Sequence, residues 1–173
     1  MSYNLDIFGK EELTRIAEIS TKLMNEKLPG LNSFVLYGGL AREDTPSAWD
    51  IDLMIVSNHI KPQYTTKGST KQSGTFFKEI IGLVNDDEFT KNLTNGLLDI
   101  HLLHPDFFSD LEYRINFFKQ LNNQDPFFFY NSIMRDGLLY NPNTCKFDIK
   151  AREKYNQIIQ KSIENRRRYN LNY

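Results

Sequence analysis

The spacing of apolar residues divides the chain into helical and extended segments. Near the N-terminus the apolar positions fall on one helical face, and Pro29-Gly30 predicts the end of that helix. The residues on this face are Leu13, Ile16, Ala17, Leu23 and Met24. Three short apolar runs, at 34–37, 51–56 and 97–103, are typical of buried strands. The first half of the chain therefore mixes a helix with strands.

Polar segments separate these runs. Residues 43–48 are turn-forming, and the segment 57–75, rich in Ser, Thr, Lys and Gln, predicts a long loop. A helical pattern returns at 76–84. A second one begins at Pro105 and places its apolar positions on one face, namely Phe107, Phe108, Leu111, Ile115 and Phe118.

The C-terminal third predicts a short strand and a final helix. Residues 127–135 fit a helix or a strand equally well, whereas 137–142 indicates a short strand closed by a turn. Apolar positions from about 147 to 168 share one helical face. We therefore expect an α/β (α+β) domain with a small mixed sheet over 1–142. A C-terminal helix and basic tail, 143–173, would pack on it.

Composition and charge narrow the class of protein. The chain has 173 residues, 40% of them apolar, and a formal net charge of −1, which gives no overall attraction to nucleic acid. Cys145 is the only cysteine, so the chain forms no internal disulfide. The N-terminal segment is acidic and amphipathic and lacks the apolar run of a signal peptide, and no run approaches the length of a membrane span. We expect a cytoplasmic protein.

Three aspartates lie within or beside the predicted strands. On an extended strand Asp50 and Asp52 would point to the same side, about 7 Å apart, while Ile51 takes the opposite face. Asp99 lies in the middle of the run LLDIHLL, where a carboxylate is costly unless something neutralises it. A divalent cation with carboxylate ligands would do so. The simpler interpretation of an isolated D-x-D is an exposed strand end.

Two other features lie near these aspartates. Gly38-Gly39 ends the first predicted strand eleven residues before Asp50, and paired glycines let backbone N–H groups approach a phosphate. The alternative is an ordinary tight turn. His101 shares the predicted strand face of Asp99, and we interpret it as a partly buried structural histidine.

Together these residues resemble a known superfamily. The order is a strand, a Gly-Gly turn, about ten residues, a D-x-D strand and a later acidic strand. It reads LYGGLAREDTPSAWDIDLMIV and then LLDIHLL here. It resembles the DNA polymerase beta-like nucleotidyltransferases, and within them the minimal and aminoglycoside-type enzymes. The resemblance covers about residues 31–142, including the late segment RDGLLYNP.

The resemblance implies a fold, an activity and a set of site residues. Asp50, Asp52 and Asp99 would hold Mg²⁺ or Mn²⁺, and Gly38, Gly39 and Arg42 would position the phosphates of a nucleoside triphosphate. A nucleoside monophosphate would pass to an acceptor hydroxyl with release of pyrophosphate, and Asp99 could take the proton. We expect the acceptor to be a small molecule or a protein sooner than nucleic acid, and leave a homodimer open.

Departures from the pattern leave an alternative function open. Gly39 stands where many members have serine, Glu43 replaces a small residue after Arg42, and Trp49 replaces a frequent serine before Asp50. The alternative is a binding protein of the same fold that pairs, antitoxin-like, with a small helical partner and has little or no catalysis. A haloacid dehalogenase-type phosphatase fits less well, since its strand precedes the D-x-D pair, and a glycosyltransferase needs a larger fold.

Overall fold

The computed structural model describes residues 8–28, 33–45, 48–58, 74–110, 112, 128–157 and 160. The long loop expected at 57–75 lies mostly outside these residues, as does the basic tail. The helix expected from Pro105 ends at Ser109, because the backbone of Asp110 is extended, and most of its remaining expected range lies outside these residues. In chain order, the elements are α1 (Lys10–Lys27), β1 (Ser33–Tyr37), α2 (Gly38–Ala41), β2 (Ile51–Val56), α3 (Gly74–Val84), α4 (Asp87–Thr94), β3 (Leu98–Leu103), α5 (Asp106–Ser109), α7 (Phe128–Asp136), β4 (Leu138–Asn141) and β5 (Lys146–Lys150).

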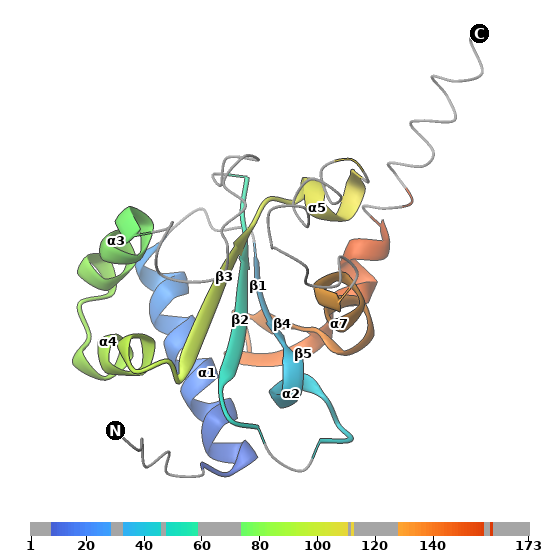
Figure 1. Ribbon diagram of the computed structural model, residues 1–173. Coiled ribbons are helices and arrows are strands. Elements are labelled where there is room, and N and C mark those ends of the chain that lie inside the picture. The colour runs from blue at the N-terminus through green and yellow to red at the C-terminus, as the bar shows by residue number, and fades with distance from the viewer. Residues whose placement is uncertain are drawn as a thin grey trace, which may run out of the picture.

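A mixed five-stranded sheet forms the centre of the protein. Its strand order is β3-β2-β1-β4-β5. β2 and β3 are parallel, and the other neighbouring pairs are antiparallel. Figure 1 shows α1, α3 and α4 on one side of this sheet and α5 and α7 on the other. The protein therefore has the α+β architecture expected from the sequence, with the strands at 34–37, 51–56 and 97–103 as neighbours.

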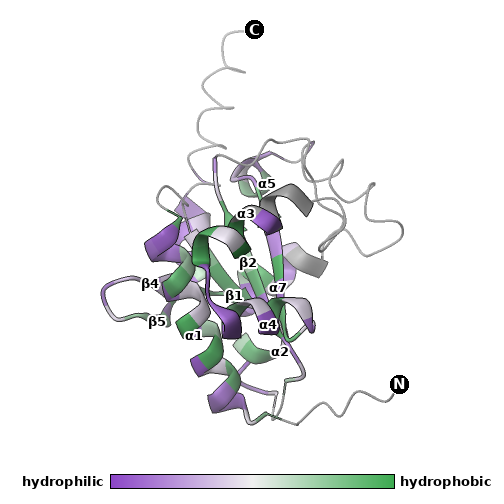
Figure 2. Ribbon diagram, turned by 90° about the vertical axis from the view of Figure 1, so that its left-hand side faces the viewer, coloured by the Kyte–Doolittle hydropathy of each residue, from purple (hydrophilic) through white to green (hydrophobic). Residues whose placement is uncertain are grey.

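Each face of the sheet has its own hydrophobic cluster, because side chains alternate along every strand. On the side of α1, α3 and α4, Leu53 and Ile100 are fully buried. On the opposite side, Met54, Phe107 and Ile133 fill the second cluster. Figure 2 shows the hydrophobic strands behind α1, whose own colouring is mixed. Asp52 and Asp99 lie on the second face, by alternation with Met54 and Leu103.

The N-terminal helix follows the predicted apolar face. Leu13, Ala17 and Met24 are buried against the sheet, while Ile19 on the other side is half-exposed. The helix ends at Lys27, where the Leu28 N–H donates to the Met24 carbonyl at 2.8 Å. The end predicted from Pro29-Gly30 is thus confirmed to within two residues.

The start of the final helix was predicted wrongly. Residues 146–150 form β5, which pairs with β4, and helical structure begins at Ala151. The turn between the two strands explains the difference. Cys145 adopts a φ of 56°, and its N–H donates to the Asn141 carbonyl at 2.8 Å, so the chain reverses and returns along β4. Phe147 is buried on one side of β5. A strand of five residues is too short for its alternation of buried and exposed positions to be distinguished from a helical face.

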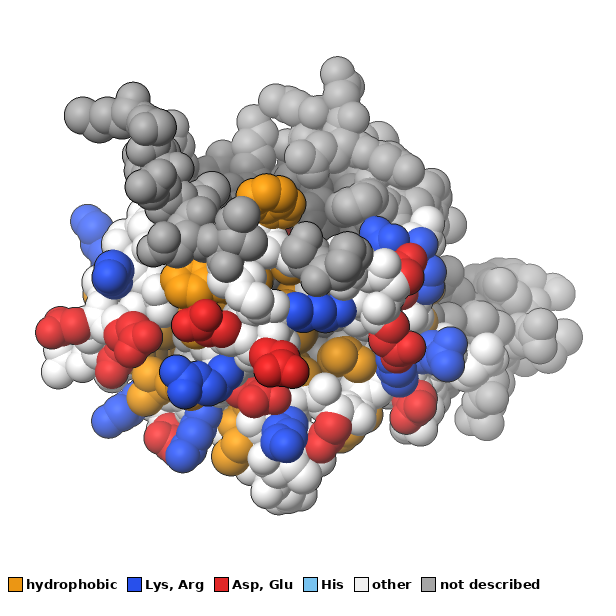
Figure 3. Space-filling view, turned by 90° about the horizontal axis from the view of Figure 1, so that it is seen from below, with side chains coloured by type: hydrophobic (Ala, Val, Ile, Leu, Met, Phe, Trp, Pro, Cys, Tyr) orange, Lys and Arg blue, Asp and Glu red, His pale blue; other side chains and the backbone are white. Residues whose placement is uncertain are grey.

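Charged side chains of both signs are interspersed at the end of the molecule where β2 and β3 begin, which Figure 3 views from below. This agrees with the near-zero net charge. Among the described helices, none combines the length and the apolar character that a bilayer span requires.

Candidate metal centre

Strand pairing brings two of the predicted aspartates together. In the register of the sheet, Tyr37 of β1 lies opposite Asp52 of β2, and Asp52 lies opposite Asp99 of β3. These three residues form a row across three strands on one face. Asp52 and Asp99 thus lie side by side because β2 and β3 are parallel neighbours.

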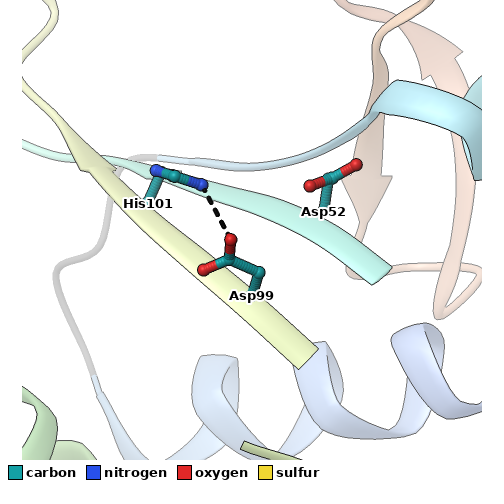
Figure 4. A group of neighbouring side chains, drawn as sticks. All are labelled: Asp52, Asp99 and His101. Atoms are coloured by element: carbon teal, nitrogen blue, oxygen red, sulfur yellow. Dashed lines mark hydrogen bonds and ion pairs between the residues drawn. The ribbon is translucent and has the colours of Figure 1, made fainter. Parts of the chain in front are cut away.

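His101 completes a group of possible metal ligands. One ligand atom from each of Asp52, Asp99 and His101 can be chosen so that all three lie within 4.8 Å of one another. The His101 Nε2 and the Asp99 Oδ2 are 3.2 Å apart and share a hydrogen bond (Figure 4). The group therefore offers two carboxylate oxygens and one imidazole nitrogen, from two neighbouring strands.

Asp50 lies beside this group but not within it. It precedes the first residue of β2 and its side chain is exposed. Its carboxylate is nevertheless partly shielded from solvent, and this, followed by the charge of Asp99, raises the pKa of Asp50 above its ordinary value, so the two carboxylates influence each other electrostatically. The structure thus brings Asp52 and Asp99 together directly and leaves Asp50 at the edge.

The turn after β1 is closely fitted to Asp52. Gly38 has a φ of 73°, and a Cβ at this position would overlap the Asp52 Oδ2. A side chain at Gly39 would meet only the Ala48 Cβ, at 3.7 Å. Gly38 is therefore required for the approach of the Asp52 carboxylate to the backbone, whereas Gly39 has ordinary space around it.

Arg42 is engaged with another residue. Its guanidinium donates to both carboxylate oxygens of Asp44 at 3.0 Å, and this ion pair is exposed. Contact with a phosphate would require Arg42 to exchange this partner. An exposed ion pair of this kind contributes little to stability, so the exchange would cost little.

The carboxylates of the site have no lysine or arginine partner among the described residues. Two described lysines make their contacts elsewhere: Lys150 pairs with Glu43 at 3.3 Å, and Lys10 donates to the carbonyls of Arg42 and Thr45. No hydrogen bond or ion pair reaches the Asp52 carboxylate within the described part of the chain. Within the described part of the chain, the carboxylates of Asp52 and Asp99 therefore have no basic side chain paired with them other than His101.

The pKa values of the two central aspartates move in opposite directions. Burial, together with the charges of Asp50 and Asp99, raises the pKa of Asp52 to about 6, although His101 partly opposes this. The hydrogen bond from His101 holds the pKa of Asp99 below its ordinary value despite burial. Burial next to these carboxylates also raises the pKa of Tyr37 well above 10.0. A cation bound between Asp52 and Asp99 would remove the repulsion that raises the pKa of Asp52.

The pKa of Asp52 leads to a prediction for the metal-free protein. The folded-state pKa of about 6 exceeds the ordinary 3.8, so the folded protein holds a proton that the unfolded chain has released, and stability falls as pH rises between these values. We expect Asp52→Asn to raise the free energy of unfolding by about 1–3 kcal/mol near neutral pH, because one pKa unit corresponds to about 1.4 kcal/mol. Below the ordinary pKa the gain should vanish.

Denaturant unfolding of both proteins in EDTA, at a neutral and a strongly acidic pH, measures this difference. Because the variant is compared with the wild type at each pH, the titration of other groups cancels. An equal difference at the two pH values would show that Asp52 is not the group responsible.

From the sequence, His101 was interpreted as a structural histidine, whereas the structure places it among the possible metal ligands with Asp52 and Asp99. The signal was present, since residues two apart on a strand share a face, and the sequence therefore already put His101 beside Asp99. The comparisons with known proteins add nothing to this geometry: no protein-family model matches the chain, and no curated protein gives a significant match.

Proposed function

We propose that the chain is a metal-dependent nucleotidyltransferase, which transfers a nucleoside monophosphate from a nucleoside triphosphate to an acceptor hydroxyl. The observation that carries this proposal is the pairing of Asp52 with Asp99 against the Gly38 turn. It supports the order of motifs that resembles the polymerase beta-like superfamily. Asp50, at the edge of the group, would complete the carboxylate set.

The donor atoms present fit a divalent cation. Asp52 and Asp99 would hold Mg²⁺ or Mn²⁺ between β2 and β3, with Asp50 available to a second ion. When bound, such a cation neutralises the carboxylates and stabilises the charge on the phosphate oxygens. The raised pKa of Asp52 agrees with this assignment, since burial and then the charges of Asp50 and Asp99 disfavour its ionised form, which a bound cation would stabilise.

The residues of the chain would then divide the work of the reaction. The backbone at Gly38 and Gly39 and the side chain of Arg42 would orient the β- and γ-phosphates. The acceptor oxygen forms a bond to the α-phosphorus while the bond from that phosphorus to the bridging oxygen breaks, and pyrophosphate leaves. The acceptor proton would pass to Asp99.

A screen with labelled nucleotides tests the proposal. Purified protein would be incubated with each α-labelled nucleoside triphosphate, Mg²⁺ or Mn²⁺, and one acceptor class at a time: hydroxyl-bearing small molecules, proteins and RNA ends. The near-zero net charge, and the charges of both signs on the face shown in Figure 3, favour a small molecule or a protein over nucleic acid. Nucleotide binding without transfer to any acceptor would instead support the antitoxin-like binding protein.

A metal ion together with a nucleotide should stabilise the fold. A ligand that binds only the native state at a hundredfold excess over its Kd adds about 2.7 kcal/mol, and we expect a shift of this order in thermal melts with Mn²⁺ and a non-hydrolysable triphosphate. The double variant Asp50→Asn, Asp52→Asn should show no shift. An unchanged melting temperature of the wild type at millimolar metal and nucleotide would contradict the proposal.

Trp49 offers an independent measurement of the same binding. It is the only tryptophan of the chain, it directly precedes Asp50, and its side chain is 67% exposed. Its neighbours are fixed, since Ala48 is buried beside Gly39 and Ile51 is buried in β2. Indole fluorescence should therefore change as nucleotide binds, and this titration gives the affinity without any assay of transfer.

A further inference from the structure

The ligand group at β2 and β3 contains a nitrogen that the proposed carboxylate site does not use. His101 lies on the same strand face as Asp99, two residues further along β3. Its Nε2 belongs to the set of ligand atoms that lie within 4.8 Å of one another (Figure 4). The same atom is 3.2 Å from the Asp99 Oδ2, so it points into the space between the carboxylates and not away from them.

The imidazole is also held in this position by its surroundings. Its side chain is only 15% exposed. The rings of His101 and Tyr37 lie edge to face, with centroids 6.1 Å apart. In the register of the sheet, His101 lies opposite the buried Met54. To bind an ion, Nε2 would give up its hydrogen bond to Asp99 and use its lone pair, with the ring proton on Nδ1. A ring fixed in this way needs little other rearrangement.

We infer that His101 is a third protein ligand of the metal in this site, and that the site takes Mn²⁺ in preference to Mg²⁺. This inference rests on the proposed function only for the presence of a divalent cation between Asp52 and Asp99. Mg²⁺ binds oxygen ligands almost exclusively, whereas an imidazole nitrogen favours first-row transition ions. Mn²⁺ accepts both kinds of donor and still binds phosphate oxygens.

The hydrogen bond to Asp99 suggests another role for His101, which is to position that carboxylate. The substitution His101→Gln separates the two roles. A glutamine amide can reach the place of Nε2 and still donate to Asp99, but it removes the imidazole nitrogen. If His101 is a metal ligand, His101→Gln should lower the Mn²⁺ affinity. If His101 only positions Asp99, the Mn²⁺ affinity should be largely unchanged, because glutamine can still donate to that carboxylate.

Electron paramagnetic resonance of bound Mn²⁺ gives the direct test. The wild-type protein, without nucleotide, is expected to show modulation from a coordinated ¹⁴N nucleus and to bind Mn²⁺ at least about tenfold more tightly than Mg²⁺. In His101→Gln the nitrogen signal should disappear and Mn²⁺ affinity should fall by about tenfold or more, with Mg²⁺ affinity little changed.

His104→Gln is the matched control. The Nδ1 of His104 lies 3.2 Å from an Asp106 oxygen, at the end of β3 away from the group, and His104 is not one of the possible ligands. This variant should keep both the nitrogen signal and the Mn²⁺ affinity of the wild type. Melts of both variants establish that each is folded.

The outcomes separate this inference from the proposed function. Mn²⁺ bound with no nitrogen coupling, or unchanged affinity in His101→Gln, overturns the assignment of His101 even if the protein transfers nucleotides. Nitrogen coupling that is lost in His101→Gln supports the assignment even if no acceptor is ever labelled. In that case only the transfer activity would be refuted.

Discussion

The double substitution Asp50→Asn, Asp52→Asn is expected to abolish nucleotide transfer and leave the protein folded. Asparagine keeps the shape of each side chain but removes the charge that would hold the cation. Loss of electrostatic stabilisation at a reacting phosphate should reduce kcat by on the order of 10³-fold or more. The fold should not suffer, because the substitutions remove a buried charge and its repulsion with the neighbouring carboxylates, which together raise the pKa of Asp52.

A control with the same change in net charge is available on α4. Asp87 and Glu88 are exposed residues in the first turn of that helix, which packs on the other side of the sheet. Asp87→Asn with Glu88→Gln should leave transfer intact. Residual wild-type activity in the Asp50, Asp52 variant would remove these residues from the site. Lost activity accompanied by a lower melting temperature would indicate a structural role.

The second large effect is expected at Gly38. A methyl group there would overlap the Asp52 carboxylate and would also strain a backbone whose φ is 73°. We expect Gly38→Ala to lower the free energy of unfolding by about 1–3 kcal/mol, the usual cost of a strained backbone conformation. Mn²⁺ affinity should fall as well, since Asp52 has to move.

Two comparisons identify the cause of this effect. Gly39→Ala inserts the same methyl group one residue later, where its nearest neighbour would be Ala48 at 3.7 Å, and stability should change by about 0.5 kcal/mol or less. In an Asp52→Ala background the carboxylate is absent, so Gly38→Ala should cost less than in the wild type. Equal costs in the two backgrounds, measured by denaturant unfolding, would mean that contact with Asp52 plays no part.

The strands near the site were predictable because each is a short, continuous apolar run, which is typical of a buried strand. The run 51–56 is apolar and begins directly after the first aspartate of the D-x-D pair, and the structure forms β2 over the same residues. If 51–56 and 97–103 are both buried strands, a carboxylate on either one is costly unless something neutralises it. One cation can neutralise both carboxylates only if the two strands bring them together. The neighbouring positions of Asp52 and Asp99 therefore followed from the cost of burying a charge.

The parts of the structure that the sequence did not predict depend on contacts between residues that are not neighbours in the chain. β5 was read as helix because its recognition requires the reversed turn at Cys145, and nothing local to 147–150 shows the pairing with β4. Similarly, Arg42 pairs with Asp44, but an exposed arginine could take any of several acidic partners, so the sequence does not show which one it takes. The hydrogen bond between His101 and Asp99 follows from their spacing, but its importance emerged only when Asp52 was placed beside them.

The alignment of Tyr37, Asp52 and Asp99 across the sheet also bears on how the chain folds correctly. β2 and β3 are parallel, and a slip of one residue would place Leu98 or Ile100 opposite Asp52. The same slip would turn Asp99 toward the cluster around Leu53 and Ile100, where burying an unpaired carboxylate costs several kcal/mol. The acidic residues thus weaken the native sheet but penalise the misregistered sheet more, and an ion bound between them would increase this difference in free energy.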